Sequence, residues 1–543
     1  MRWRDEWRHG LLRSGMRRAR LLVWVLLLGA CNGDDATGPE PEPAPRYAHA
    51  PGIRLTSLAI NQGVETELVV GDEVRTPDQY LVPMLADRPM LVRASFSVHH
   101  EFAPRELLGQ LRVSYPEGTL DGEGQPLREW VDDSLVMISQ DSSLTTLTGT
   151  FAWYLARDKV LPGMRVRVDA YEPEPLAEDE LEPTPDPAAI GADRIDAPAL
   201  PWAESSAPIE LSTKPMRLKI KLVPIEHQLD GCVETAEVDD EDIAAMVEQM
   251  AQNNGVHEVE ISVREPLVIS EPIGEQDNGF SPVLAVLSQT HEAEGAPANE
   301  YWYGLVVSCD GFPAGLSGQA FGIPKTPTAD LGYQRVAAGR WVGEGALAAE
   351  TFVHEVGHLQ GRYHVRCSGT EAGTDANYPH PGGITGVWGF GLYDLGLHSP
   401  AGSRDYMTYC ANEWVSDYGW NHTWAFIEAL TALDSAEIIE QPDEILVGMI
   451  HPNGSAQWWT TRGAVAGDGN ETHWLNWDLE GERVTVLAES WEMPDGDSMV
   501  VTAPLPEGGL GLDARASFSL AGPIVDELGP QAGALELLRR VGR

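Results

Sequence analysis

Apolar and polar residues alternate in short runs along residues 53–171, and turn-forming residues separate the runs. The alternation is clearest over 90–98 and 164–168. A period of two places successive side chains on opposite faces of a strand, so this pattern predicts half-buried strands. Many short strands with turns between them favour a β-sandwich-like domain.

The pattern changes from residue 213 onward, where apolar runs alternate with helical periods. We expect strands at 216–223, 256–268, 302–307 and 315–323 and helices near 240–253, 281–293, 345–359 and 416–432. Strands alternating with helices favour an α/β sheet with crossover connections. Residues 436–543 return to short alternating runs, which predicts a small C-terminal β domain.

Three segments contain too little apolar surface to form domains. Residues 172–212 are rich in Pro, Glu, Asp and Ala and predict an acidic linker. Residues 1–30 combine several arginines with an apolar run at 21–28 that is too short to span a bilayer, which is typical of an export signal peptide. Residues 31–52 form a polar tether between this signal and the first domain.

The signal ends in Leu28-Gly29-Ala30-Cys31, which resembles the bacterial lipobox. In a lipobox the cysteine is acylated, so Cys31 would anchor the protein to a bacterial membrane, in the periplasm or at the cell surface. The lipid would be the only contact with the membrane. The alternative is an ordinary signal peptide with a chance cysteine, which would give a secreted protein.

The chain is strongly acidic. It contains 83 Asp and Glu against 37 Lys and Arg, a formal net charge of −46 at pH 7. Such a surface repels phosphate backbones and argues against a nucleic-acid partner. The acidic stretches 174–186 and 239–242 lack the spacing of an EF-hand, so a structural Ca²⁺ site is not supported.

Four cysteines follow Cys31: Cys232, Cys309, Cys367 and Cys410. An even number in an exported protein suggests two disulfides. Three pairings are possible, and proximity in sequence favours 232 with 309 and 367 with 410. Free thiols, or a cysteine that ligates a metal, are the alternatives for the second pair.

One segment, His354-Glu355-Val356-Gly357-His358 and onward to Gly361 and His364, has the spacing of a metal site. Two histidines four residues apart on a helix lie on one face and can reach one ion. Gly361 can end the helix with a sharp turn that returns His364 as a third ligand. Three neutral nitrogens leave a fourth position open for water, as in catalytic zinc sites. Glu355 lies beside that position and can act as a general base.

The extended pattern H-E-x-x-H-x-x-G-x-x-H resembles the metzincin zinc peptidases. The resemblance implies one catalytic Zn²⁺ and a Met-turn, which Asp405-Tyr406-Met407-Thr408-Tyr409-Cys410 matches. Met407 would lie beneath the imidazoles as an apolar floor. Tyr409 occupies the position of the tyrosine that ligates zinc and stabilises the oxyanion in astacins and serralysins; the alternative is a core aromatic. The turn would also bring Cys410 close to Cys367.

Blocks at 377–389, 405–410 and 414–418 are similar to a group of predicted bacterial secreted zinc proteases, over roughly 215–435. The resemblance implies a metzincin-like α/β (α+β) catalytic domain at 213–435, with a mixed sheet and an active-site helix. Together with the β domains that the alternating runs predict on either side, this gives a multidomain protein.

The expected function is zinc-dependent endopeptidase cleavage of exposed proteins or glycoproteins, with an extended substrate pairing along 315–323. The alternatives are a surface-binding, adhesin-type lipoprotein with secondary or lost peptidase activity, and hydrolysis of a non-protein amide.

Overall fold

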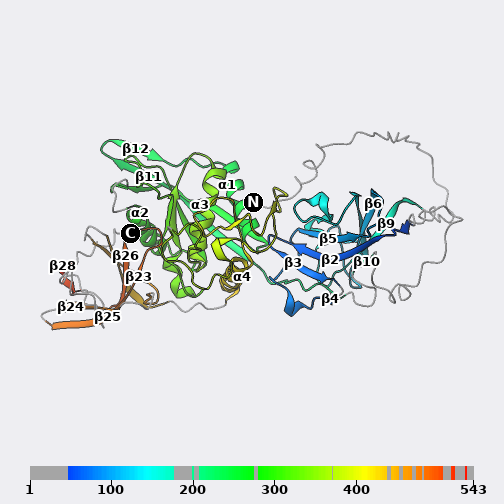
Figure 1. The fold of residues 1–543 in the computed structure, drawn as a ribbon. Helices are drawn as coiled ribbons and strands as arrows, with labels where there is room; N and C mark the ends of the chain where they lie inside the picture. The colour runs from blue at the N-terminus through cyan, green and yellow to red at the C-terminus, as the bar shows by residue number, and fades with distance from the viewer. Residues whose placement is uncertain are drawn as a thin grey trace, which may run out of the picture. The chain divides into compact units, whose positions relative to one another are not determined.

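A computed structural model describes residues 47–71, 73–175, 199–200, 207–273, 279–369, 371–436, 442–451, 456–467, 472–479, 482–505, 515–519 and 532–534. These residues form a multidomain structure of mixed α+β type that is rich in β-sheet (Figure 1). The predicted signal peptide and Cys31 lie outside the described residues. None of the helices in the described part of the chain is long and apolar enough to cross a membrane.

Two antiparallel sheets form the N-terminal region. The first has the order β1 (Tyr47–His49), β9 (Arg165–Pro175), β6 (Arg105–Ser114), β7 (Glu129–Ile138), with β10 (Ala199–Leu200) paired to β9. The second has the order β4 (Glu73–Val74), β3 (Glu65–Val70), β2 (Ile53–Asn61), β5 (Met90–Val98), β8 (Phe151–Leu155). Leu107 and Leu111 of β6 share one core with Phe151 of β8. A Cβ at Gly109 would lie 2.3 Å from the Phe151 ring, so this glycine lets the two sheets approach.

The borders of this region differ from those expected. Within the stretch expected as a tether at 31–52, β1 pairs with β9. Within the stretch expected as a linker at 172–212, β9 continues to Pro175 and Ser212 N donates to Met84 O. An acidic, proline-rich composition still permits backbone pairing where a neighbouring strand offers a partner.

A mixed sheet forms the centre of the described chain. Its order is β12 (Cys232–Thr235), β11 (Arg217–Leu229), β15 (Glu300–Val306), β17 (Val336–Arg340), β16 (Gly318–Ala320), with β13 (Glu258–Val263) and β14 (Leu267–Ile269) also paired to β11. β11, β15 and β17 are parallel, whereas β16 is antiparallel to β17 and ends the sheet. The single strand expected at 256–268 is therefore two strands, and β17 was not predicted.

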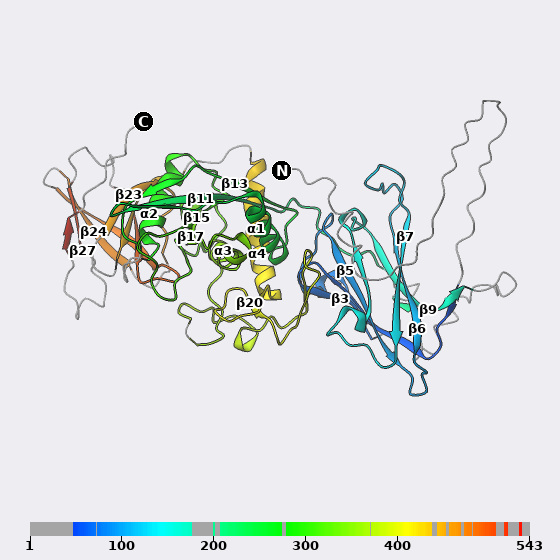
Figure 2. The ribbon, with the colours of Figure 1, turned by 90° about the horizontal axis from the view of Figure 1, so that it is seen from above.

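The two faces of this sheet belong to different cores, whose helices are labelled in Figure 2. One core contains residues of α1 (Asp240–Asn253), α3 (Gly345–Leu359) and α4 (Asp417–Ala432), and the other contains residues of α2 (Ser281–Ala293). β15 serves both, since the Tyr303 ring packs edge-on against Phe352 of α3 while Trp302 packs against His291 of α2. Residues facing opposite sides alternate along the strand, as expected for a sheet covered on both faces.

The N-terminus of α3 is fixed by an acidic segment of α1. Asp239 caps α1 by accepting hydrogen bonds from the backbone of Glu241 and Asp242. Asp242 in turn accepts a hydrogen bond of 2.7 Å from the backbone N–H of Gly345, the first residue of α3. Carboxylates satisfy the unpaired N–H groups at helix starts. The acidic run at 239–242 thus positions two helices.

Beyond α4, an antiparallel sheet makes up the described C-terminal region. Its order is β23 (Ala456–Arg462), β22 (Glu444–Ile450), β26 (Met499–Pro504), β25 (Glu482–Glu492), β24 (Thr472–Leu479), β27 (Arg515–Ser519), β28 (Ala532–Ala534). Ile445 and Val447 of β22 lie in the same core as α2. This packing holds the hairpin between β25 and β26 against the central sheet.

Short elements complete the description. Two-stranded sheets join β18 (Gly389–Phe390) to β19 (Leu397–His398) and β20 (Arg404–Asp405) to β21 (Glu413–Trp414). Short 3-10 helices lie at Pro77–Gln79, Leu147–Gly149, Arg157–Lys159, Ala329–Gln334, Pro381–Gly383 and Leu433–Ser435.

Candidate metal centre

Helix α3 ends immediately after it has presented His354, Glu355 and His358. Gly361 has a φ of 83°, and its N–H donates to the His358 carbonyl at 2.9 Å. The next N–H, of Arg362, donates back to Gly357 O at 3.0 Å. This pair of bonds is the Schellman arrangement, which requires a left-handed residue and favours glycine. The chain therefore reverses after Gly361 and returns toward the helix.

The reversal brings three imidazoles together. Each Nδ1 lies close to a backbone carbonyl: His354 to Tyr406 O at 2.8 Å, His358 to Arg362 O at 2.7 Å, and His364 to Ala372 O at 2.7 Å. An Nδ1 beside a carbonyl oxygen has to carry the proton, which leaves the Nε2 lone pair free. The Nε2 atoms of His358 and His364 are only 3.1 Å apart.

Converging lone pairs of this kind fit a metal ion. His354, His358 and His364 are all buried, and His354 Nε2 has no hydrogen-bond partner among the described residues. Burial, followed by the neighbouring His358, lowers the pKa of His354 to about 3, so this ring is neutral near pH 7. Neutral nitrogens with fixed tautomers suit zinc and other divalent transition metals. The donor set thus forms a histidine-rich candidate metal site.

Glu355 lies beside the three histidines. Its side chain is buried, and Oε2 lacks a hydrogen-bond partner in the described structure. A Cβ at Gly318 of β16 would come within 2.6 Å of Glu355 Oε1, so the missing side chain makes room for the carboxylate. Burial, and then the charge of Asp495, raises the pKa of Glu355 well above its ordinary range. A carboxyl group in such a place is poised to exchange a proton.

Met407 packs directly against the helix that carries the ligands. It is fully buried, and a Cβ at Gly357 would lie 2.6 Å from its sulfur. Its carbonyl accepts a hydrogen bond from Val365 N at 2.8 Å, next to the third histidine. The residue expected to form an apolar floor therefore lies against the helix between His354 and His358.

A buried ion pair couples the helix end to this turn. Arg362 Nη2 donates to Asp405 Oδ1 at 2.9 Å, and the two side chains are 1% and 0% exposed. Asp405 Oδ1 also accepts a hydrogen bond of 3.0 Å from Met407 N. The pair could not be predicted from the sequence, because the separation of 43 residues between Arg362 and Asp405 gives no indication that the two side chains meet.

Tyr409 lies at the opening of the site. Its hydroxyl is 3.2 Å from His364 Nε2, and the residue is 48% exposed. This exposure is incompatible with a core aromatic. Burial of the hydroxyl end, followed by the nearby Asp495 carboxylate, raises the pKa of Tyr409, so it remains a neutral hydrogen-bond donor.

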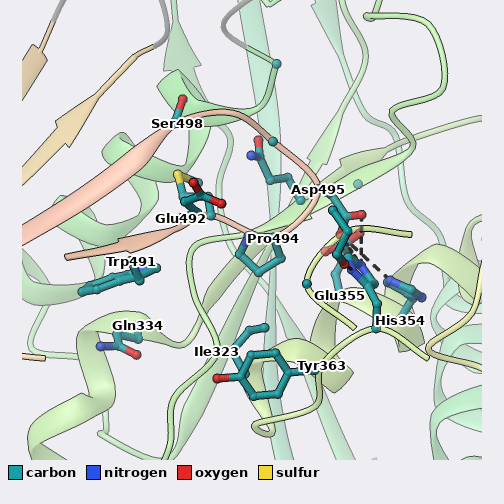
Figure 3. A pocket seen from close by; sticks show the side chains of 18 of the residues that line it. Ile323, Gln334, His354, Glu355, Tyr363, Trp491, Glu492, Pro494, Asp495 and Ser498 are labelled. Carbon is teal, nitrogen blue, oxygen red and sulfur yellow. Dashed lines mark hydrogen bonds and ion pairs between the residues drawn. The ribbon is translucent and has the colours of Figure 1, made fainter. Parts of the chain in front are cut away.

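A fourth candidate ligand, an acidic residue, reaches the histidines from the C-terminal sheet. Asp495, at the tip of the β25–β26 hairpin, lies with His354, His358 and His364 in one group of potential metal ligands. Figure 3 shows its carboxylate pointing toward His354 and Glu355. Nothing in the sequence around Asp495 marks it as a site residue. The Pro494-Asp495-Gly496 segment is a turn signal, but a turn signal does not tell where the hairpin will pack.

The site opens into a large cavity of about 1370 Å³. Its wall includes Gly318 and Gln319 of β16, Tyr363 and Tyr409 near the histidines, and Trp491 of the C-terminal hairpin. The volume is above the usual range for small-molecule pockets. A cavity of this size beside the last strand of a sheet can hold an extended chain.

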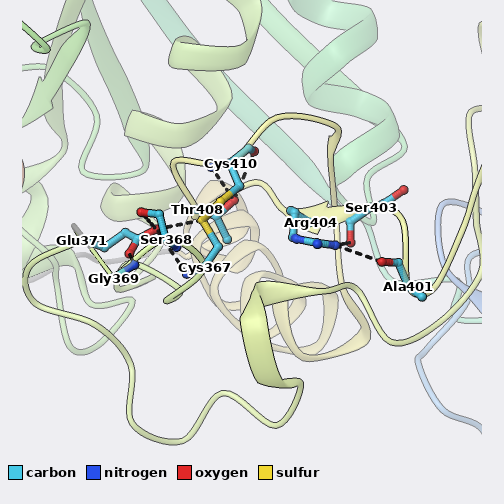
Figure 4. The surroundings of a disulfide bond; sticks show 9 residues. All are labelled: Cys367, Ser368, Gly369, Glu371, Ala401, Ser403, Arg404, Thr408 and Cys410. Atoms are coloured by element: carbon cyan, nitrogen blue, oxygen red, sulfur yellow. Dashed lines mark hydrogen bonds between the residues drawn. A yellow bond between two sulfur atoms is a disulfide. The ribbon is translucent and has the colours of Figure 1, made fainter.

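Both pairs of cysteines favoured by proximity are disulfides, Cys232–Cys309 and Cys367–Cys410. The second bridge joins the segment after His364 to the segment after Met407, with a Cα–Cα distance of 6.3 Å (Figure 4). It excludes free thiols and a cysteine metal ligand at this position. Disulfides are typical of extracellular or periplasmic proteins.

The sequence matches no known protein family and no curated protein. Among solved structures, metalloproteinase-II from Bacteroides fragilis is 12% identical with a TM-score of 0.21, over 57% of this chain and 78% of its own.

A chaperone–substrate complex contains a chain that is 12% identical with a TM-score of 0.23, over 53% of this chain. This chain spans 40% of its length. A calcium-binding mutant of Bacteroides uniformis β-glucuronidase 2 is 9% identical with a TM-score of 0.12, over 47% of this chain and 27% of its own. TM-scores this low do not establish a shared fold, so the function has to be inferred from the site itself.

Proposed function

We propose that this protein is a zinc-dependent endopeptidase. The observation that carries the proposal is the convergence of three buried Nε2 lone pairs, on His354, His358 and His364, beside the carboxyl group of Glu355. The histidines alone would suit a structural metal. A carboxyl oxygen without a partner beside them supports a reaction that moves a proton.

A zinc ion held by the three histidines would supply a Lewis acid that activates water and polarises a substrate carbonyl. Glu355 takes a proton from the attacking water and returns it to the leaving nitrogen. A C–O bond forms, the C–N bond breaks, and the products are a carboxylate and an amine. The Tyr409 hydroxyl donates a hydrogen bond to the oxygen that becomes negatively charged.

Peptides or exposed segments of proteins and glycoproteins are the proposed substrates. β16 is the last strand of the central sheet, and its Gly318 lies against Glu355. An extended peptide can add to such an edge through main-chain hydrogen bonds, which would place a peptide bond beside the carboxyl group. Of the stretch expected at 315–323, only Gly318–Ala320 is strand.

Export and lipid anchoring are also proposed. The two disulfides support export, while the acylation of Cys31 depends on its sequence context alone. Mass spectrometry of the mature N-terminus tests acylation, and an unmodified N-terminus at another residue would remove it.

The decisive test combines metal analysis with cleavage-site profiling of a peptide library, with and without chelator. We expect one zinc per chain, lost in His358→Ala. Glu355→Gln should keep zinc and lose about 10²–10⁴-fold in activity. Asp495→Gly is assayed beside the native chain, because Asp495 lies where substrate has to bind. Failure of both proteins to cleave any bond while both hold zinc would overturn the proposal.

A further inference from the structure

The hairpin between β25 and β26 has a closely defined tip. Met493 N donates to Ser498 O at 2.9 Å and closes the turn. Asp495 has a φ of 55°, in the left-handed region where Asp is tolerated better than most residues. The Asp495 carboxylate lies in the candidate metal centre (Figure 3).

The Asp495 carboxylate meets all three histidines. Oδ1 is 3.1 Å from His364 Nε2, and Oδ2 is 3.3 Å from His358 Nε2 and 4.0 Å from His354 Nε2. The Tyr409 hydroxyl donates a hydrogen bond to Oδ1. The Asp495 side chain is 9% exposed. A carboxylate oxygen is an ordinary zinc ligand, and with three imidazoles it completes a tetrahedral set.

The hairpin is also attached to the edge of the central sheet. Trp491 Nε1 donates to Phe321 O at 3.0 Å, directly after β16. A Cβ at Gly496 would lie 2.0 Å from Gln319 Nε2, so the hairpin tip packs against the Gln319 side chain of β16. Ser498 Oγ is 2.9 Å from Ser281 Oγ at the start of α2. These contacts place the hairpin where an extended substrate would have to lie.

Two features argue against a permanently closed, structural metal site. A site with four protein ligands has no use for Glu355, whose Oε2 remains buried without a hydrogen-bond partner in the described structure. The cavity beside the histidines has a volume of about 1370 Å³, which a structural site does not require. Both features can serve catalysis once the Asp495 carboxylate has moved away from the histidines.

We propose that Asp495 is the fourth ligand of the metal centre and that the β25–β26 hairpin is an autoinhibitory element. It keeps the enzyme latent until the C-terminal region is displaced or cleaved. Latency rests on the proposed peptidase function. Closure of the metal site by Asp495 can be tested independently of that function.

The experiment compares the full-length chain with three variants. Asp495→Gly removes the carboxylate and accepts the left-handed backbone. Asp495→Asn keeps the volume of the side chain, so this variant replaces Asp495→Gly in the test if the glycine variant folds poorly. Asp497→Ala is the matched control, because Asp497 is an exposed acid in the same turn. Each protein is loaded with Co²⁺ and titrated with acetohydroxamate, while the absorption spectrum reports binding at the metal.

If the native metal site is open for less than a tenth of the time, its apparent affinity for acetohydroxamate is more than tenfold lower than the affinity of a site that is always open. We therefore expect Asp495→Gly to bind acetohydroxamate at least about tenfold more tightly than the native chain. Asp497→Ala should behave like the native chain. Peptide cleavage by the zinc-loaded proteins should rise in parallel.

Equal hydroxamate affinity in the native and Asp495 variants would overturn the proposal, as would failure of the native chain to bind the metal. Tighter hydroxamate binding by Asp495→Gly without any peptide cleavage would support the closure and count against the peptidase function. The two ideas can therefore fail separately.

Discussion

Three glycines shape the candidate metal centre, because each of them lacks a side chain. Gly357 leaves room for Met407, Gly318 leaves room for Glu355, and Gly361 permits the reversal that returns His364. At two of these positions the reason is a close approach, and at the third it is a positive φ. Each can be tested by adding one methyl group.

Gly357→Ala is expected to destabilise the protein even though alanine favours helices. The gain in helix propensity is about 1 kcal/mol. The new Cβ would lie 2.6 Å from Met407 Sδ and 2.8 Å from the Tyr406 ring, and both residues are buried. Overpacking costs about 1–3 kcal/mol and should prevail. Thermal unfolding and zinc content of the variant measure the effect.

The control is Leu347→Ala on the same helix, where the side chain is 65% exposed. It should change neither measurement. Unaltered stability and zinc content in Gly357→Ala would show that Met407 can move away without loss.

Glu371 stabilises the loop beside the disulfide through its charge. Its carboxylate accepts backbone hydrogen bonds from Cys367 at 3.2 Å, Ser368 at 3.0 Å and Gly369 at 2.8 Å. Partial burial opposes ionisation, but these donors outweigh it and lower the pKa of Glu371 to about 2. The folded state therefore holds the proton less tightly than the unfolded chain does, where the pKa is about 4.3.

The pH dependence follows from this difference. The contribution of Glu371 should be complete above the unfolded pKa and disappear as the pH falls through about 2. Glu371→Gln should lower the free energy of unfolding by about 1.5–3 kcal/mol at neutral pH. The gap between native and variant should narrow in acid, as measured by denaturant unfolding from pH 7 to pH 2. Glu123→Gln, at an exposed turn, is the control. If the stability difference between the native chain and Glu371→Gln did not depend on pH, the charge of Glu371 would not be what stabilises the loop.

At the scale of elements, the end of α3 and the Met407 turn behave as one unit. Three connections join them: the hydrogen bond from Val365 to Met407, the Arg362–Asp405 pair, and the Cys367–Cys410 bridge. Only the bridge could be anticipated from the sequence. Together they hold the third histidine beside the two on the helix.

Asp405→Ala should be strongly destabilising. It leaves the Arg362 charge buried at 1% exposure without its partner and removes the acceptor of Met407 N. Loss of one member of a buried pair costs about 3–5 kcal/mol. The double variant Arg362→Met, Asp405→Ala should recover part of the loss, because it no longer buries an unpaired charge. Urea unfolding of both proteins checks this, and a double variant less stable than the single one would contradict it.

At the scale of the whole molecule, the candidate metal centre combines residues of the central region with one residue of the C-terminal sheet. In the described structure the three histidines lie on and after α3, whereas Asp495 comes from the hairpin between β25 and β26. An ion bound between them would stabilise both regions together. Among the described residues, none of the N-terminal sandwich belongs to this group of ligands.

Removal of the metal should therefore destabilise the chain. A ligand present at 100 times its dissociation constant stabilises the native state by about 2.7 kcal/mol. Calorimetry of the full chain should show a lower Tm after chelation. His358→Ala should start at the lower Tm and not respond to chelator. An unchanged Tm of the zinc-loaded native chain after chelation would contradict the site.

Features that depend on neighbours along the chain could be predicted from the amino-acid order. The helix at Gly345–Leu359, the three histidines with Glu355, and the turn at Gly361 follow from the geometry of one helix and its end. Helices α1 and α2 also begin and end where their periodicity predicted.

Features that join distant segments depend on how the elements pack, and the amino-acid order did not predict them. β17 is short and rich in alanine and glycine, so its pattern did not distinguish it from a loop, and parallel neighbours buried it. Asp495 is 131 residues from His364 in sequence, and its place at the histidines depends on how β22 and the hairpin pack against α2 and β16. The periodicity of apolar residues shows which face of a helix or strand is buried. Which other element covers that face depends on packing between elements.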